Sequence, residues 1–185
     1  MVTFINLLTI SRIFLAVVIF ALLMSPDGYL LALILFLIAG ITDYYDGYLA
    51  RKYSAVSQLG EVLDPIADKI LILFVLFGLA LNLSSYLIGF IAAIIIAREI
   101  WVGALRDLNA RNNRSNLTKV TFLAKIKTTI QLFTISIYLL GLAINNMFIL
   151  VLGDIFLFIS LFITLYTGLI YSLNTFQEDE PIKQK

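Results

Sequence analysis

The sequence predicts an all-α integral membrane protein with six transmembrane helices and both termini in the cytoplasm. Of its 185 residues, 61% are hydrophobic, and the mean hydropathy is +1.00. A soluble domain is nearer 45 to 50% apolar. The apolar residues fall into runs of about 20, the length that crosses a bilayer as a helix. Short polar breaks separate most of these runs, which indicates closely connected antiparallel helices.

In chain order, the expected helices cover residues 5–24, 29–51, 61–81, 85–105, 126–144 and 148–174. The first is interpreted as a retained helix. Arg12 is the only positive residue before its apolar core, and no small-x-small cleavage pattern follows, as a signal peptide would require. The last is longer than a bilayer needs, so it is expected to tilt or to project beyond the membrane. Residues 1–176 then form one domain, and residues 177–185 form a polar cytoplasmic tail.

The placement of Lys and Arg predicts the orientation. The connections near residues 26, 83 and 145 contain neither residue type, whereas the opposite helix ends are rich in both. Because positively charged loops stay in the cytoplasm, both termini and the two longer connections, 52–60 and 106–125, are expected there. We therefore expect a multi-pass protein of the cytoplasmic (inner) membrane, in contact with membrane lipids. The net charge is only +1, and no nucleic-acid partner is expected.

Four aspartates lie within 26 residues of this apolar chain: Asp43, Asp46, Asp64 and Asp68. A bare charge at the bilayer centre costs roughly 2.5 to 3.5 kcal/mol on insertion scales, so four need neutralisation. At 100° per residue, the first two share a helix face with the small residues Gly47 and Ala50, and the last two lie one turn apart. The loop between the two helices is short. The helices should therefore be antiparallel neighbours whose carboxylates converge.

Oxygen-only ligands suit hard divalent cations, so converging carboxylates predict a site for two Mg²⁺ or Mn²⁺ ions. Two such ions about 3.5 to 4 Å apart support in-line displacement at phosphorus. The chain has no His and no Cys, so acid–base chemistry falls to Asp, Glu, Lys or Tyr. Arg51 is placed to hold a phosphate. Gly60 is expected to mark the bend into the third helix, and Pro65 to lie near the start of that helix.

The complete run from Asp43 to Asp68 reads D-x2-D-G-x2-A-R-x8-G-x3-D-x3-D. It resembles the signature of the CDP-alcohol phosphatidyltransferase family, whose six-helix plan also matches the helix count above. The resemblance covers most of the chain up to about residue 145. Segments 6–12, 98–106 and 124–131 resemble the members that use sn-glycerol 3-phosphate as the acceptor. Ile5 and Ala124 depart from the pattern, which commonly has Pro and Gly there.

The resemblance implies transfer of a phosphatidyl group from CDP-diacylglycerol to sn-glycerol 3-phosphate, giving phosphatidylglycerophosphate and CMP. It implies that Asp43, Asp46 and Asp64 ligate the metals and that Asp68 contacts the second ion and acts as general base. It also implies a set of residues around the cytidine diphosphate group of CDP-diacylglycerol: Asn6, Thr9, Arg12, Gly47, Ala50, Arg51 and Ser57. A homodimer is an expectation from the family alone.

The acceptor would bring a dianionic phosphate, which needs basic partners. The candidates are Arg98, Arg106, Lys125 and Lys127. An alternative for Arg98 is an ion pair with Glu99 or with an aspartate of the metal site. Phosphatidylglycerol, inositol phosphate or serine are alternative acceptors, although a neutral or lipidic acceptor would not need four basic residues.

The aspartates have two other interpretations. They could form ion pairs with Lys or Arg of another helix, or they could line the cation pathway of a small divalent-cation channel or carrier. A transporter would need a polar path to the outer face. Residues 29–39 and 70–81 are wholly apolar there, which argues against this class.

Overall fold

The computed structural model describes residues 2–52, 58–119 and 121–177; within these ranges the side chains of residues 2–6, 44, 46–52, 58, 59, 61 and 62 are outside the description. The described chain forms six long helices and two short 3-10 turns, and it contains no strand. The long helices are α1 (Val2–Leu22), α2 (Tyr29–Lys52), α3 (Gln58–Asn82), α4 (Tyr86–Arg111), α5 (Phe122–Ala143) and α6 (Met147–Gln177). The turns are η1 (Pro26–Gly28) and η2 (Ser115–Thr118).

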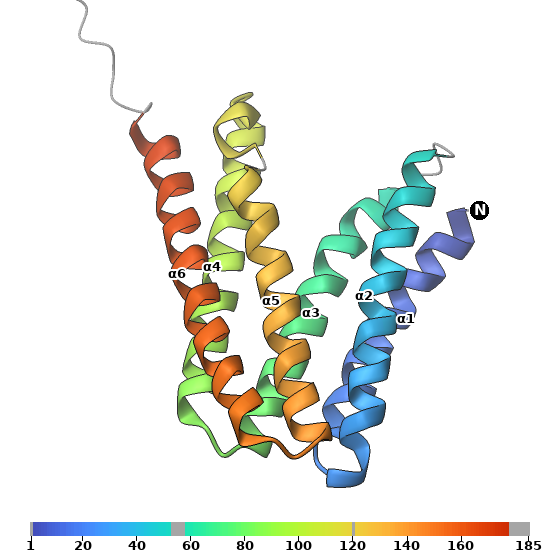
Figure 1. Cartoon of the computed structure of the whole chain (residues 1–185). Helices are drawn as coiled ribbons and strands as arrows, with labels where there is room; N and C mark the ends of the chain where they lie inside the picture. The colour runs from blue at the N-terminus through green and yellow to red at the C-terminus, as the bar shows by residue number, and fades with distance from the viewer. Residues whose placement is uncertain (1, 53–57, 120, 178–185) are drawn as a thin grey trace, which may run out of the picture.

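The helices run up and down in chain order and form two groups, α1 to α3 and α4 to α6 (Figure 1). The connections α1–α2, α3–α4 and α5–α6 lie at one end of the bundle. The start of α1, the end of α6 and the α4–α5 connection lie at the other end, where the two groups diverge. Contacts of α2 with α5, and of α3 with α4 and α5, join the groups.

The apolar core lies between the helices on the side of the three short connections. Ala16 and Ile19 of α1 and Leu23, directly after it, are buried at the helical repeat, and they pack in one cluster with residues of all five other helices. Gly78 of α3 lies close to the end of α1, because a Cβ built there would lie 3.3 Å from Phe20 Cδ2 and 2.7 Å from Cδ1 of Leu23, the residue after the helix. Toward the start of α1, the same face carries two buried polar residues, Thr9 and Arg12. The packing of α1 on α3 therefore also positions these two polar groups.

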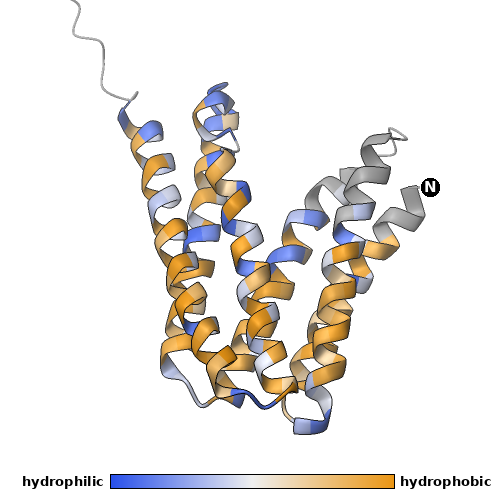
Figure 2. Cartoon of the chain, viewed as in Figure 1, coloured by the Kyte–Doolittle hydropathy of each residue, from blue (hydrophilic) through white to orange (hydrophobic). Residues whose placement is uncertain are grey.

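Four stretches of the described chain are long and apolar enough to cross a membrane, in α2, α4, α5 and α6, and α1 adds the shorter apolar stretch Leu7–Leu22. Large apolar side chains such as Phe14, Phe90 and Phe162 are exposed on the outside of the bundle, as expected for a surface that faces lipid. Polar residues gather toward the end where the helix groups diverge (Figure 2). The chain is thus an all-helical integral membrane protein, whereas six membrane crossings and cytoplasmic termini stay predictions.

The structure corrects several predicted boundaries. The fourth helix continues to Arg111 and does not end at residue 105, and the fifth begins at Phe122 and not at residue 126. Hydropathy reports how long a segment is apolar, whereas a helix end depends on where the backbone hydrogen bonds stop. Thr121 sets the start of α5, since its hydroxyl accepts a hydrogen bond from the amide of Ala124. Gly60 lies buried inside α3 and not at a bend before it.

Candidate active site

Two side chains of α1 gather three of the predicted aspartates. The Thr9 hydroxyl donates a 2.6 Å hydrogen bond to Asp64 Oδ1. Arg12 Nη1 lies 2.8 Å from Asp43 Oδ1 and 2.8 Å from Asp68 Oδ1. Thr9 and Arg12 are almost fully buried, whereas the side chains of Asp43 and Asp68 are 41% and 39% exposed. Carboxylates from α2 and α3 therefore converge on the polar end of one face of α1.

Arg12 bridges two like charges. The same guanidinium nitrogen donates a hydrogen bond to Asp68 and forms an ion pair with Asp43, which offsets the repulsion between the two carboxylates. The sequence assigned Thr9 and Arg12 to the nucleotide, and that role stays a prediction. The alternative that the aspartates form ion pairs with Lys or Arg of another helix is confirmed for Asp43 and Asp68, but the partner, Arg12, was not identified. A signal was present, because Arg12 is the only charged residue of α1 and shares a helix face with the core residues Ala16 and Ile19.

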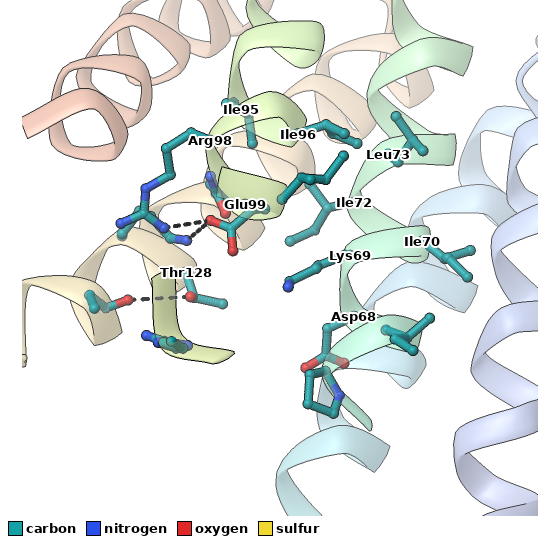
Figure 3. A pocket seen from close by; sticks show the side chains of 17 residues that line it. Asp68, Lys69, Ile70, Ile72, Leu73, Ile95, Ile96, Arg98, Glu99 and Thr128 are labelled. Atoms are coloured by element: carbon teal, nitrogen blue, oxygen red, sulfur yellow. Dashed lines mark hydrogen bonds and ion pairs between the residues drawn. The ribbon is translucent and has the colours of Figure 1, made fainter. Parts of the chain in front are cut away.

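A cavity of about 390 Å³ lies beside Asp68, between α3, α4 and α5 (Figure 3). Its volume falls within the range of small-molecule sites, roughly 300 to 1,000 Å³. Asp68 and Lys69 of α3 form one side, and isoleucines and a leucine form an apolar floor. The other side carries polar residues of α4 and α5: Arg98, Glu99, Arg106, Lys127, Thr128 and Gln131.

Arg98 is held by α6. Its Nε donates to the Thr164 carbonyl oxygen at 3.1 Å, and its Nη2 donates to the Thr167 hydroxyl at 2.7 Å. Its Nη1 donates to Glu99 Oε1 at 2.9 Å, which confirms the predicted alternative of an ion pair with Glu99. Gly168 permits the close approach of α6, because a Cβ there would lie 3.0 Å from Arg98 Cγ. A guanidinium has five N–H donors, so donors remain for a ligand.

Glu99 joins the basic residues of two helices. The same oxygen, Oε1, accepts hydrogen bonds from Arg98 of α4 and from the ammonium of Lys127 of α5. Gln131 donates a 3.3 Å hydrogen bond to the Thr164 hydroxyl and thereby ties α5 to α6 as well. This group of contacts fixes the wall of the cavity opposite Asp68.

The structure brings three of the four predicted acceptor residues to this cavity. Arg98, Arg106 and Lys127 line it, and Arg106 also stacks on the ring of Tyr171, with 5.6 Å from its guanidinium carbon to the ring centroid. Lys125 is exposed and is not among the lining residues. Two residues along a helix correspond to a rotation of about 200°, so Lys125 and Lys127 leave α5 on nearly opposite faces.

The model of the family described as CDP-alcohol phosphatidyltransferase matches residues 2–166. This chain belongs to that family. Among its relatives, a protein of Rickettsia bellii is 41% identical over 90% of this chain and 91% of its own length. Proteins of Rickettsia felis and Shigella flexneri are 40% and 33% identical, again over 90% of this chain and 91% of their own length. All three are named CDP-diacylglycerol–glycerol-3-phosphate 3-phosphatidyltransferase.

The family signature runs across the end of α2 and the start of α3. For several predicted site residues the structure describes the helical backbone but not the side chain. These are Asn6 of α1 and, within the signature, Asp46, Gly47, Ala50 and Arg51. Ser57 lies outside the described residues altogether. The assignment of these residues to metal or nucleotide therefore stays a prediction.

The chemistry of the described carboxylates fits a hard cation, although no three acidic, His or Cys side chains among the described ones form a complete metal site. Every candidate ligand is a carboxylate oxygen. Asp43 and Asp68 already share a cationic partner, Arg12, which shows that both oxygens are directed at one centre of positive charge. The signature places Asp46 one turn from Asp43 on the same face of α2.

Sequence reasoning also missed the contribution of α6 to this family member's site. Its buried polar residues lie three or four positions apart along one face of an otherwise apolar helix: Ser160, Thr164, Thr167, Tyr171 and Thr175. In a membrane helix, polar side chains on one face indicate contact with neighbouring helices. That spacing was the available signal, and in the structure the Thr167 hydroxyl accepts from Arg98 and the Thr164 hydroxyl accepts from Gln131.

Proposed function

We propose that this chain transfers the phosphatidyl group of CDP-diacylglycerol to sn-glycerol 3-phosphate, giving phosphatidylglycerophosphate and CMP. One observation carries the proposal. The converging carboxylates of α2 and α3 adjoin a cavity whose opposite wall is basic, and Asp68 belongs to both. A liponucleotide at the carboxylates and a phosphorylated acceptor in the cavity would meet at Asp68. The names of the relatives from Rickettsia and Shigella describe the same reaction.

The four aspartates of the signature would hold two divalent cations, Mg²⁺ or Mn²⁺. Such ions, when bound, neutralise the pyrophosphate and the charge that develops on the leaving group. The terminal hydroxyl oxygen of the acceptor forms a bond to the phosphorus that carries diacylglycerol, and the bond from that phosphorus to CMP breaks. CMP leaves with the electron pair. Asp68 takes the hydroxyl proton late in the displacement, as carboxylates do in other phosphoryl transfers.

The basic wall supports a phosphorylated acceptor. Arg98 keeps N–H donors beyond its three protein contacts, and Lys127 and Arg106 line the same cavity. A dianionic phosphate there would take charge-assisted hydrogen bonds from all three. Serine and phosphatidylglycerol carry no terminal phosphate monoester, so they would leave this charge unmatched.

A groove between α2 and α5 suits an acyl chain of the donor. It has a volume of about 490 Å³, and its lining is mainly apolar: Phe36, Leu37, Gly40, Ile41, Tyr45, Leu132 and Ser136. Gly40 and Ile41 lie less than one helical turn before Asp43, so the groove leads from the carboxylates into the apolar part of the bundle. A Cβ on Gly40 would meet no atom within 4 Å, which leaves the groove open at that point. Diacylglycerol anchored in lipid would then present its pyrophosphate to the aspartates.

The proposed setting is a multi-pass protein of the inner membrane with six crossings and with its site and termini on the cytosolic side. The distribution of Lys and Arg supports this orientation, and polar residues gather at the end where the helix groups diverge (Figure 2). The transporter alternative is disfavoured. Beyond the carboxylates, α3 continues with the buried residues Leu71, Val75 and Leu79, which pack in the apolar core and offer no polar path.

The test is CMP release by the purified protein in detergent with CDP-diacylglycerol and Mg²⁺. Glycerol 3-phosphate, inositol phosphate, serine and phosphatidylglycerol are offered in turn. We expect release with glycerol 3-phosphate alone, abolished by EDTA. Release with another acceptor alone would retain the phosphatidyl transfer but refute the acceptor assignment. No release with any acceptor, from protein that is demonstrably folded, would refute the transferase assignment.

A further inference from the structure

Glu99 has one oxygen that makes no hydrogen bond within the part of the chain that the structure describes. Both of its hydrogen bonds, from Arg98 at 2.9 Å and from Lys127, go to Oε1. Among the described residues, nothing donates a hydrogen bond to Oε2. The side chain lines the cavity and is 19% exposed. Figure 3 shows the second oxygen pointing away from Arg98, into the space that Lys69 and Asp68 face from the other side.

An acid at this point is unfavourable for binding a phosphate. Glu99 occupies one N–H donor of Arg98 and one of Lys127, and its negative charge repels an anionic ligand. If these basic residues only had to attract a phosphate, an uncharged residue at position 99 would serve better. The carboxylate therefore indicates a ligand that also carries hydrogen-bond donors. Oε2 can only accept a hydrogen bond, so a ligand group that binds it must be a donor.

The acceptor in the proposed reaction carries such a donor. sn-Glycerol 3-phosphate has a phosphate, a terminal hydroxyl that reacts and a secondary hydroxyl between them. With the phosphate at Arg98 and Lys127 and the reacting hydroxyl at Asp68, the middle of the molecule would cross the space between the two walls, toward which the second oxygen of Glu99 points. The geometry points to Glu99 as a specificity-determining residue that accepts a hydrogen bond from the secondary hydroxyl. This inference rests on the proposed function.

A hydrogen bond to a charged partner in a partly desolvated site discriminates strongly against a ligand that lacks it. The matched ligand is 3-hydroxypropyl phosphate, which keeps the phosphate and the terminal hydroxyl and lacks only the secondary hydroxyl. For the unmodified protein we expect kcat/KM to be roughly 10- to 100-fold higher with sn-glycerol 3-phosphate. The ratio of the two kcat/KM values is the readout, because a general loss of activity affects both substrates and cancels.

The decisive variant is Glu99→Ala, for which the ratio should fall to within about threefold of one. Glu99→Gln is the second variant, in case the alanine variant does not fold. Its carbonyl oxygen can stay on Arg98 and Lys127, which places an NH₂ group where Oε2 was. The NH₂ group cannot accept a hydrogen bond, so the ratio should fall well below that of the unmodified protein.

Thr167→Val is the matched control. Thr167 holds Arg98 from α6, so its loss weakens the phosphate side of the cavity without removing the acceptor for the hydroxyl. We expect lower kcat/KM with both substrates and an unchanged ratio.

A ratio near one in the unmodified protein, or an unchanged ratio in both Glu99 variants, would overturn the inference and leave the proposed function intact. The inference would also be overturned if the ratio fell as far for Thr167→Val as for Glu99→Ala. A general change in the geometry of the cavity wall would then explain both results. No turnover of sn-glycerol 3-phosphate by the unmodified protein would instead refute the proposed function itself.

Discussion

Replacement of Arg12 by Met removes the cation between two carboxylates while retaining most of the buried side-chain volume. Arg12 Nη1 is 2.8 Å from an oxygen of Asp43 and 2.8 Å from an oxygen of Asp68, so these oxygens are at most about 5.6 Å apart. At an effective dielectric constant of about 20, two unit charges at that distance repel by about 3 kcal/mol. The aspartates are 41% and 39% exposed, and solvent screening reduces this to about 1 to 2 kcal/mol.

A divalent cation at the same carboxylates relieves this repulsion. Arg12→Met should therefore destabilise the protein in EDTA, and Mg²⁺ should restore more stability to the variant than to the unmodified protein. Because about 1.4 kcal/mol corresponds to a factor of ten in Kd, the Mg²⁺ concentration needed for a given rise in stability should fall roughly tenfold.

The assay is thermal unfolding in detergent during a Mg²⁺ titration, followed by intrinsic fluorescence. Arg111→Met is the matched control, because Arg111 pairs with Asp107 on the surface of α4 and lies 76% exposed. We expect this control to behave as the unmodified protein does. An equal loss of Tm for Arg12→Met in EDTA and in Mg²⁺ would refute the reasoning, as it would show that Arg12 acts only through packing.

The remaining predictions concern the base, the acceptor and the lipid chain. Asp68→Asn should lower turnover about 10²- to 10⁴-fold with little change in CDP-diacylglycerol binding, and a full rate in this variant would disprove the base assignment. Lys127→Ala should raise the KM for glycerol 3-phosphate about tenfold or more, as expected for a lost charged hydrogen bond, whereas Lys125→Ala should change it less than about twofold. Steady-state kinetics test this, and equal changes in KM for the two lysine variants would show that the cavity is not the acceptor site. Gly40→Phe should reduce kcat/KM for long-chain CDP-diacylglycerol about tenfold, equivalent to the burial of about two methylene groups, and should leave kcat/KM for a short-chain donor unchanged. Gly103→Phe is its control, since a Cβ there also meets nothing within 4 Å; a loss that is the same for both chain lengths would exclude the groove.

Local sequence patterns predicted much of the candidate site. Regular spacing placed Asp64 and Asp68 one turn apart on the same helix, and the structure brings both to α1. The short connection between α2 and α3 predicted that Asp43 would join them, and it does so through Arg12. These inferences succeed because the helical period is a local property, and a short loop leaves few ways for two helices to pack.

Contacts between distant helices were beyond such patterns. Nothing in the sequence around Arg98 indicates that its guanidinium binds Thr164 and Thr167, which lie more than 60 residues further along the chain. The pairing of Glu99 with Lys127, 28 residues apart, also joins two different helices. Such contacts depend on the rotation of each helix about its axis, and that rotation is set by close packing, for example where Gly168 admits Arg98.

The sequence by itself determined the class of the protein, the order of its helices and the family to which it belongs. Apolar length and residue spacing act within one helix, and the signature lies within a single pair of helices. Only the tertiary structure decided that Lys127 and not Lys125 lines the cavity, that Arg12 bridges two aspartates and that Glu99 has an oxygen directed into open space. Each of these depends on which face of a helix meets its neighbours, and that follows from the packing of all six helices together.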